Sequence, residues 1–148
     1  MKADKMADIT VTIGQENIKS IALKNNRNNL SDNKNMFKFA FEQEASSDIK
    51  YIKIGEKIAL DFGNNHPDKM IIKEILLNSN GENLYGDETI VEVPFKRENN
   101  KYVFIVEKNP ASFLSSVKKK TEFRGYKIIA YFGEIEYVYA FVIETDAF

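Results

Sequence analysis

The stretch from Arg124 to Glu144 constrains the fold most strongly, because it predicts a long β-hairpin. Gly133 and Glu134 separate two segments rich in Ile, Tyr, Phe and Val. Glycine supplies the positive φ that a two-residue type II′ turn requires at its first position, and the turn fixes the register. The expected cross-strand pairs on one side are Phe132 with Ile135, Ala130 with Tyr137, Ile128 with Tyr139, and Tyr126 with Phe141.

The two sides of this hairpin differ in polarity. The side just described must be buried, since burying a large apolar side chain is worth roughly 1.5 to 3 kcal/mol. The reverse side is mixed, with Lys127 and Glu136 among apolar residues, and it suits a partly covered or partner-facing surface. The possible interaction face on this side consists of Ile129, Tyr131, Val138 and Val142.

Most of the remaining chain also predicts strands, because apolar and polar residues alternate between turn-forming segments. The expected strands span 9–13, 17–23, 37–41, 49–54, 57–62, 90–95 and 102–106. Residues 70–77 fit a strand through their Ile content, but Pro67 and Gly81 also suit the ends of a helix, and both alternatives stay open. Asn109 and Pro110 predict a short helical turn, with Lys118, Lys119 and Lys120 as a solvated cluster at its end.

Together these elements predict an all-β fold, an antiparallel β-sandwich with one short helical turn. A chain of 148 residues is long enough for one domain with a real core. We expect residues 36–148 to form the sandwich domain. Residues 1–35 add one or two N-terminal strands, which can belong to the same sandwich, and an Asn-rich loop over 24–35.

Composition and missing motifs argue against most kinds of chemistry. The net charge of −1 gives no field for attracting nucleic acid, and no run approaches the roughly 18 apolar residues of a membrane span. With no Cys and a single His, the sequence lacks the ligands of common zinc sites and the thiol nucleophile. No glycine-rich phosphate loop or G-x-S-x-G element occurs. The sequence therefore predicts no enzyme, no catalytic residue, no cofactor and no metal site.

Residues 63–69 form the most polar loop, and a possible loop site there consists of Asn64, Asn65, His66 and Asp68. Oxygen donors on a turn can converge on a hard cation. However, the spacing does not match an EF-hand, and these residue types are those that any turn prefers. An ordinary turn is the favoured interpretation.

Two sets of residues carry a resemblance. Gly125-Tyr126-Lys127-Ile128 resembles the tyrosine corner of immunoglobulin-like sandwiches. Over residues 50–146 the chain also resembles a group of small, uncharacterised exported proteins and lipoproteins of Gram-positive bacteria. The segments that carry this second resemblance are 54–58, Phe62, Pro67-Asp68, Leu76-Leu77 with Gly81, 124–129 and 139–146. The resemblance implies an immunoglobulin-like domain outside the cytoplasm.

The expected function is that of a non-enzymatic, extracytoplasmic binding module for an unknown protein or glycan. A lipid anchor is possible only if an N-terminal signal was removed, because the sequence shows neither an export signal nor a lipobox Cys. One alternative is a carbohydrate-binding domain that stacks sugars on Tyr85, Tyr102 or Tyr131, with Glu134 and Glu136 as candidate carboxylates. Another is a cytoplasmic, partner-binding regulatory domain.

Overall fold

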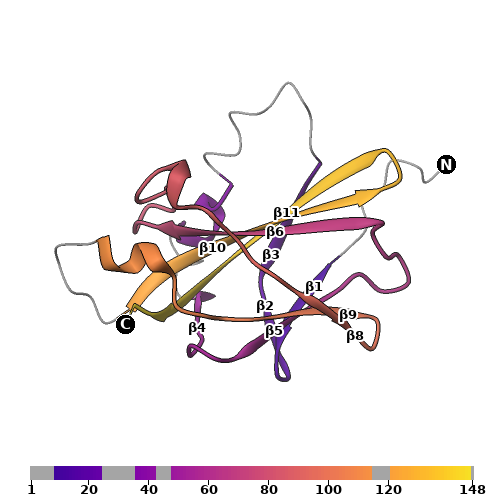
Figure 1. Ribbon diagram of the computed structural model, residues 1–148, viewed down its shortest axis with the longest axis horizontal. Helices are drawn as coiled ribbons and strands as arrows, with labels where there is room; N and C mark the ends of the chain where they lie inside the picture. Colours follow the sequence, from indigo (N-terminus) through magenta and orange to yellow (C-terminus); the bar gives the residue numbers. More distant parts are fainter. Residues whose placement is uncertain (1–8, 25–35, 43–47, 115–120, 148) are drawn as a thin grey trace.

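The computed structural model describes residues 9–24, 36–42, 48–114 and 121–147, and its strands form two sheets that enclose an apolar core (Figure 1). The predicted all-β sandwich is confirmed. Sheet A has the order β2-β1-β5-β9-β8, and sheet B has the order β3-β11-β10-β6-β7. In sheet A the strands are β1 (Thr10–Ile13), β2 (Glu16–Ile18), β5 (Lys57–Asp61), β8 (Lys96–Glu98) and β9 (Lys101–Ile105). In sheet B they are β3 (Ser20–Lys24), β6 (Lys69–Leu77), β7 (Val91–Glu92), β10 (Thr121–Phe132) and β11 (Ile135–Asp146).

The long hairpin forms the centre of sheet B. β10 and β11 pair over their whole length, and the four predicted cross-strand pairs are all present. Gly133 has a φ of 65°, as the predicted turn requires. Asp68 supports the turn, because its carboxylate Oδ2 accepts a hydrogen bond of 2.6 Å from the Gly133 N–H.

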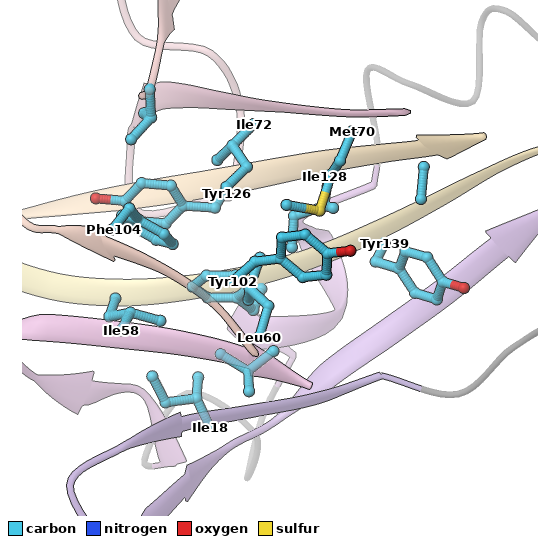
Figure 2. Close-up of a cluster of buried hydrophobic side chains, with 14 of the residues drawn as sticks. Ile18, Ile58, Leu60, Met70, Ile72, Tyr102, Phe104, Tyr126, Ile128 and Tyr139 are labelled. Atoms are coloured by element: carbon cyan, nitrogen blue, oxygen red, sulfur yellow. The ribbon is translucent and has the colours of Figure 1, made fainter. Parts of the chain in front are cut away.

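The core lies between the inner faces of the two sheets. From sheet B it receives alternate residues of three strands, including Ile72, Ile128 and Tyr139 (Figure 2). From sheet A it receives residues such as Ile58 and Leu60, and all five side chains have less than 1% of their surface exposed. This alternation is the period-2 pattern that the sequence shows.

Residues 70–77 are extended, so the strand alternative is correct: β6 pairs antiparallel with β10. Its partner β10 has Ile128 opposite Ile72 on the inner face and Lys127 opposite Lys73 on the outer face. β7 then pairs with β6 over Lys73 and Glu74. β4 (Lys50–Tyr51) is the exception to the antiparallel pattern, because it runs parallel to β11.

The predicted strand over 37–41 is wrong, because this segment forms the 3-10 turn η2 (Lys38–Phe41) on the outer face of sheet B. Phe37 is buried against Gly125, where an added Cβ would lie 2.7 Å from the ring. Phe41 contacts Phe123 edge-on, with ring centroids 5.1 Å apart. Glycine at position 125 thus leaves room for a ring directly over the sheet.

Three other expectations change in detail. Residues 17–23 are split between β2 and β3, which belong to different sheets. β8 was not predicted, although Asn99 and Asn100 form the tight turn before β9 with φ of 49° and 71°. The predicted helical turn is present as the 3-10 turn η5 (Pro110–Leu114). The structure has two further 3-10 turns in its described residues, η2 and η4 (Asp87–Thr89). The loop was expected over 24–35, but Lys24 belongs to β3, and residues 25–35 lie outside the described residues, as does the cluster at Lys118–Lys120.

Candidate functional site

A groove on the outer face of sheet B has a volume of about 1000 Å³. It lies between η2, the connection from β6 to β7, and the outward-facing residues of β6, β7 and β10. Its apolar lining comes from Met36, Phe37, Ile75, Leu77 and Ile90. Its polar lining comes from Lys73, Glu82, Asn83, Asp87, Glu92 and Lys127, with Gly81 and Gly86 between them.

The rim formed by the β6–β7 connection is held by its own hydrogen bonds. The side-chain oxygen of Asn78 accepts bonds from the N–H groups of Asn80 and Glu82, at 2.8 and 3.0 Å. The side-chain oxygen of Asn83 accepts bonds from the N–H groups of Tyr85 and Gly86, at 3.2 and 3.0 Å. A rim that is ordered before binding lowers the entropy cost of holding a ligand.

The β6–β7 connection also approaches η2 closely at Gly81, so the two walls of the groove are in contact. A Cβ added to Gly81 would lie 2.8 Å from the Phe41 ring and 3.1 Å from the carbonyl oxygen of Phe37. Only a residue without a side chain allows so close an approach, and its φ of 80° also favours glycine.

Two lysines face each other at one end of the groove. Lys73 on β6 and Lys127 on β10 are directly opposite in register, and both line the groove. Burial lowers the pKa of Lys127, and the positive charge of Lys73 lowers it further, while Glu136 acts in the opposite direction. Like charges at opposed positions destabilise a sheet. In the described residues, neither lysine forms an ion pair.

The inner face of sheet B carries a polar cluster whose charges are bonded to one another. Glu74 accepts hydrogen bonds from the Tyr126 hydroxyl at 2.6 Å, from Asn109 Nδ2 at 2.6 Å and from Arg124 Nη1 at 3.2 Å. Arg124 Nε donates to Glu122 at 2.8 Å, and Nη1 also donates to the carbonyl of Glu107. Arg124 Nη2 has no partner among the described residues.

The cluster shifts the titration of its members. Burial raises the pKa of Tyr126 well above its ordinary value, and the negative charge of Glu74 raises it further. Burial alone would lower the pKa of Arg124, but the charges of Glu74 and Glu122 outweigh it and raise that pKa. The hydrogen bond found for Tyr126 goes to a carboxylate, whereas a tyrosine corner bonds to backbone.

The possible interaction face is mostly covered by the chain itself. Ile129, Val138 and Val142 keep only 8%, 4% and 3% of their surface exposed, since they pack with Met36, Phe37 and Ala40. The expectation was a partly covered or partner-facing surface, and the structure covers these three residues with other parts of the chain. Tyr131 is partly exposed, with the Lys69 ammonium 5.7 Å from its ring centroid.

The four residues of the possible loop site do not converge. Asn64 and Asn65 are exposed beside a shallow hollow of about 480 Å³, together with Asp61. The His66 ring instead lies against Tyr102, with centroids 6.3 Å apart. Asp68 is exposed, but its carboxylate supports the β10–β11 turn. Within the described ranges no group of three or more His, Asp or Glu side chains is placed to hold a metal ion.

The residues considered for sugar binding are also dispersed. Tyr102 is 7% exposed and belongs to the core, so it offers no open ring for stacking. Tyr85 is partly exposed on the β6–β7 connection, and Glu134 is exposed at the hairpin turn. Glu136 is partly exposed and interacts with Tyr131.

None of the described helices has the length and apolarity that crossing a bilayer requires.

Sequence reasoning placed Lys127 on the mixed side of the hairpin but did not identify Lys73 as its partner. The missing information is which strand pairs with the free edge of β10, because Lys73 lies 54 positions earlier in the chain. Once residues 70–77 are treated as that strand, the hydrophobic pattern of β6 fixes the register.

The chain matches no protein-family model, no curated protein and no solved structure.

Proposed function

We propose that this protein is a non-enzymatic binding module whose ligand site is the groove on the outer face of sheet B. The observation that carries the proposal is the combination of a preformed groove of mixed apolar and polar lining with two opposed lysines. Small-molecule sites combine apolar surface with polar groups that fix the orientation of the ligand. A volume of about 1000 Å³ is large enough for a small organic molecule.

Binding rather than catalysis is supported by where the chain places its buried acidic and basic side chains. Glu74 and Arg124 bond to each other in the interior and point away from the groove. Glu82 and Asp87 on the rim accept hydrogen bonds from the side-chain amides of Asn78 and Asn83, at 3.2 and 3.4 Å. These hydrogen bonds hold the two carboxylates in the groove rim, which suits a structural role for them and not a catalytic one.

An extracytoplasmic location is part of the same proposal. Its support is the resemblance of residues 50–146 to exported proteins of Gram-positive bacteria. Fractionation of the native host tests it, with an antibody that follows the protein and a mass measurement of its mature N-terminus. Recovery outside the cytosol supports the location, and recovery in the cytosol with Met1 as the true start contradicts it.

Methyl-detected NMR tests the groove directly. We expect that small amphiphiles added to the labelled protein shift the methyl signals of Met36, Ile75 and Ile90. Ile58 and Ile72 lie in the core between the sheets and are the internal reference, so their signals stay unchanged. Shifts confined to surfaces outside the groove, or no shifts at all, contradict the proposal.

A matched pair of variants sharpens this test. Ile90→Trp adds a large ring to the groove lining and is expected to weaken the shifts. Leu84→Trp adds the same ring at an exposed position of the same connection that does not line the groove. It is expected to leave the shifts intact. Equal effects of the two variants would place the ligand elsewhere.

A further inference from the structure

The position of Lys127 leaves its positive charge poorly compensated. On one flanking strand it faces Ala140, and on the other it faces Lys73. No carboxylate is therefore directly opposite it on either side. The side chain is partly buried, and both burial and the neighbouring lysine lower its pKa. Holding such a charge costs free energy unless an anion approaches it.

The acidic residues around the groove are placed differently. Glu92 is opposite Lys73 in register, on the edge strand β7, and is exposed. Glu82 and Asp87 are exposed on the rim, and each accepts a side-chain amide hydrogen bond. Glu136 on β11 partly offsets the charge of Lys127 and also interacts with Tyr131. Exposed carboxylates are well solvated, so a ligand gains more by approaching the partly buried lysine.

The floor next to the lysines is apolar. Ile75 and Leu77 follow Lys73 at every second position of β6, and they keep 8% and 3% of their surface exposed. Met36 and Phe37 border the same hollow from η2, and Ile90 borders it from the side of β7. Along β6 the groove lining therefore changes from the lysine pair to the apolar residues Ile75 and Leu77.

We propose that the groove binds a small anionic amphiphile, with its anionic head between Lys73 and Lys127 and its aliphatic body along Ile75 and Ile90 toward Leu77. The inference rests on the proposed function and adds the chemical class of the ligand. Two ammonium groups donate charge-assisted hydrogen bonds to one oxyanion, which also removes their mutual repulsion.

Three probes with the same eight-carbon chain test the class: octanoate, 1-octanol and octylammonium. Each is titrated into the full chain at neutral pH while the groove methyls are followed by NMR. We expect octanoate to bind about 10-fold to 100-fold more tightly than 1-octanol, since each hydrogen bond to a charged group contributes appreciably. Octylammonium is expected to bind least well, because it repeats the charge of the lysines.

Variants assign the preference to the two lysines. The double variant Lys73→Met and Lys127→Met keeps the aliphatic stems and is expected to bring octanoate affinity down to that of 1-octanol. The double variant Lys73→Arg and Lys127→Arg keeps the charges and is expected to keep the preference. Lys96→Met removes an exposed lysine of sheet A and is the matched control, expected to change nothing.

The outcomes separate the two proposals. Groove binding with equal affinity for octanoate and 1-octanol, or tightest binding of octylammonium, overturns the anionic class and leaves the groove as the ligand site. An octanoate preference that survives in the Met double variant overturns the role of the lysines. Absence of groove shifts with all three probes overturns both the class and the proposed function.

Discussion

The two faces of sheet B differ in how charged side chains are paired at neighbouring positions of the same strands. On the inner face, Glu74 and Arg124 are nearly or fully buried and bond to each other and to Tyr126. On the outer face, Lys73 and Lys127 repel each other beside an open groove. Buried charges persist only with partners, so the inner cluster has a structural role. The outer lysines form no ion pair among the described residues, although Glu92 is opposite Lys73 and Glu136 partly offsets Lys127, and this arrangement suits a role in binding.

The largest expected effect comes from breaking the inner cluster. Arg124→Met leaves Glu74 and Glu122 without their cation, and removing one partner of a buried pair typically costs about 3–5 kcal/mol. Lys127→Met also replaces a cationic side chain by Met, but on the outer face. It is expected to change the unfolding free energy by less than about 1 kcal/mol. Chemical denaturation of both variants measures the difference. Equal losses would erase the distinction between the faces.

The Tyr126 hydroxyl gives the inner cluster a dependence on pH. Tyr126→Phe removes a hydrogen bond to the Glu74 carboxylate and is expected to cost about 1.5–3 kcal/mol at neutral pH. Because the folded-state pKa of Tyr126 is raised, its contribution is fully present below the unfolded pKa near 10 and is lost as pH rises above it.

The measurement for this prediction is the unfolding free energy of wild type and Tyr126→Phe as a function of pH. Above pH 10 the gap between them is expected to narrow, by up to about 1.4 kcal/mol per pH unit for one group. The comparison between the two proteins cancels the other groups that titrate in this range. A gap that stays constant or widens as pH rises would show that the hydroxyl is not shielded in the folded state.

The outer face depends on close approach at Gly125. An alanine there would place its Cβ 2.7–2.8 Å from three atoms of the Phe37 ring. We expect Gly125→Ala to cost about 1–3 kcal/mol, as overpacking does, and to move η2 and so weaken groove binding. Denaturation of Gly125→Ala with and without Phe37→Leu forms a double-mutant cycle, in which the smaller side chain restores part of the loss. If the losses in unfolding free energy of the two single variants simply add in the double variant, residues 125 and 37 are not in steric contact.

The smallest effect is expected from relieving the repulsion between the lysines. Lys73→Met removes one of two like charges that are opposite in register, and the unfolding free energy is expected to rise by about 0.2–1 kcal/mol. The gain should shrink at high salt, because screening already weakens the repulsion. Denaturation at low and high salt measures both values. A loss of stability at low salt would indicate that Lys73 mainly supports Glu92.

The sequence predicted the fold correctly where an alternating pattern and a turn residue agreed, as in the long hairpin. Gly133 set the register of the long hairpin, and the alternation along β10 identified its buried side. It failed at residues 37–41, where the alternating Phe residues look like a strand but pack over Gly125 from outside the sheet. That error also hid the burial of Ile129 and Val138, because no local pattern tells which distant segment covers a face.

The candidate site was harder to predict because it is assembled from distant parts of the chain. Lys73 and Lys127 meet only when β6 joins the edge of β10, and the apolar walls come from η2 and the β6–β7 connection. Neither lysine belongs to a motif. Loop residues such as His66 and Asp68 attracted attention through their type alone, and the structure uses Asp68 to support a turn.

The most direct test of this account is the pKa of the Lys127 ammonium, measured by NMR with and without octanoate. In the free protein we expect it to lie below the ordinary value of 10.5, because of burial and the charge of Lys73. A carboxylate bound between the lysines favours the charged form, so octanoate is expected to raise this pKa. A pKa that does not move while octanoate shifts the groove methyls would contradict the account, since the anion would then bind away from the lysine pair.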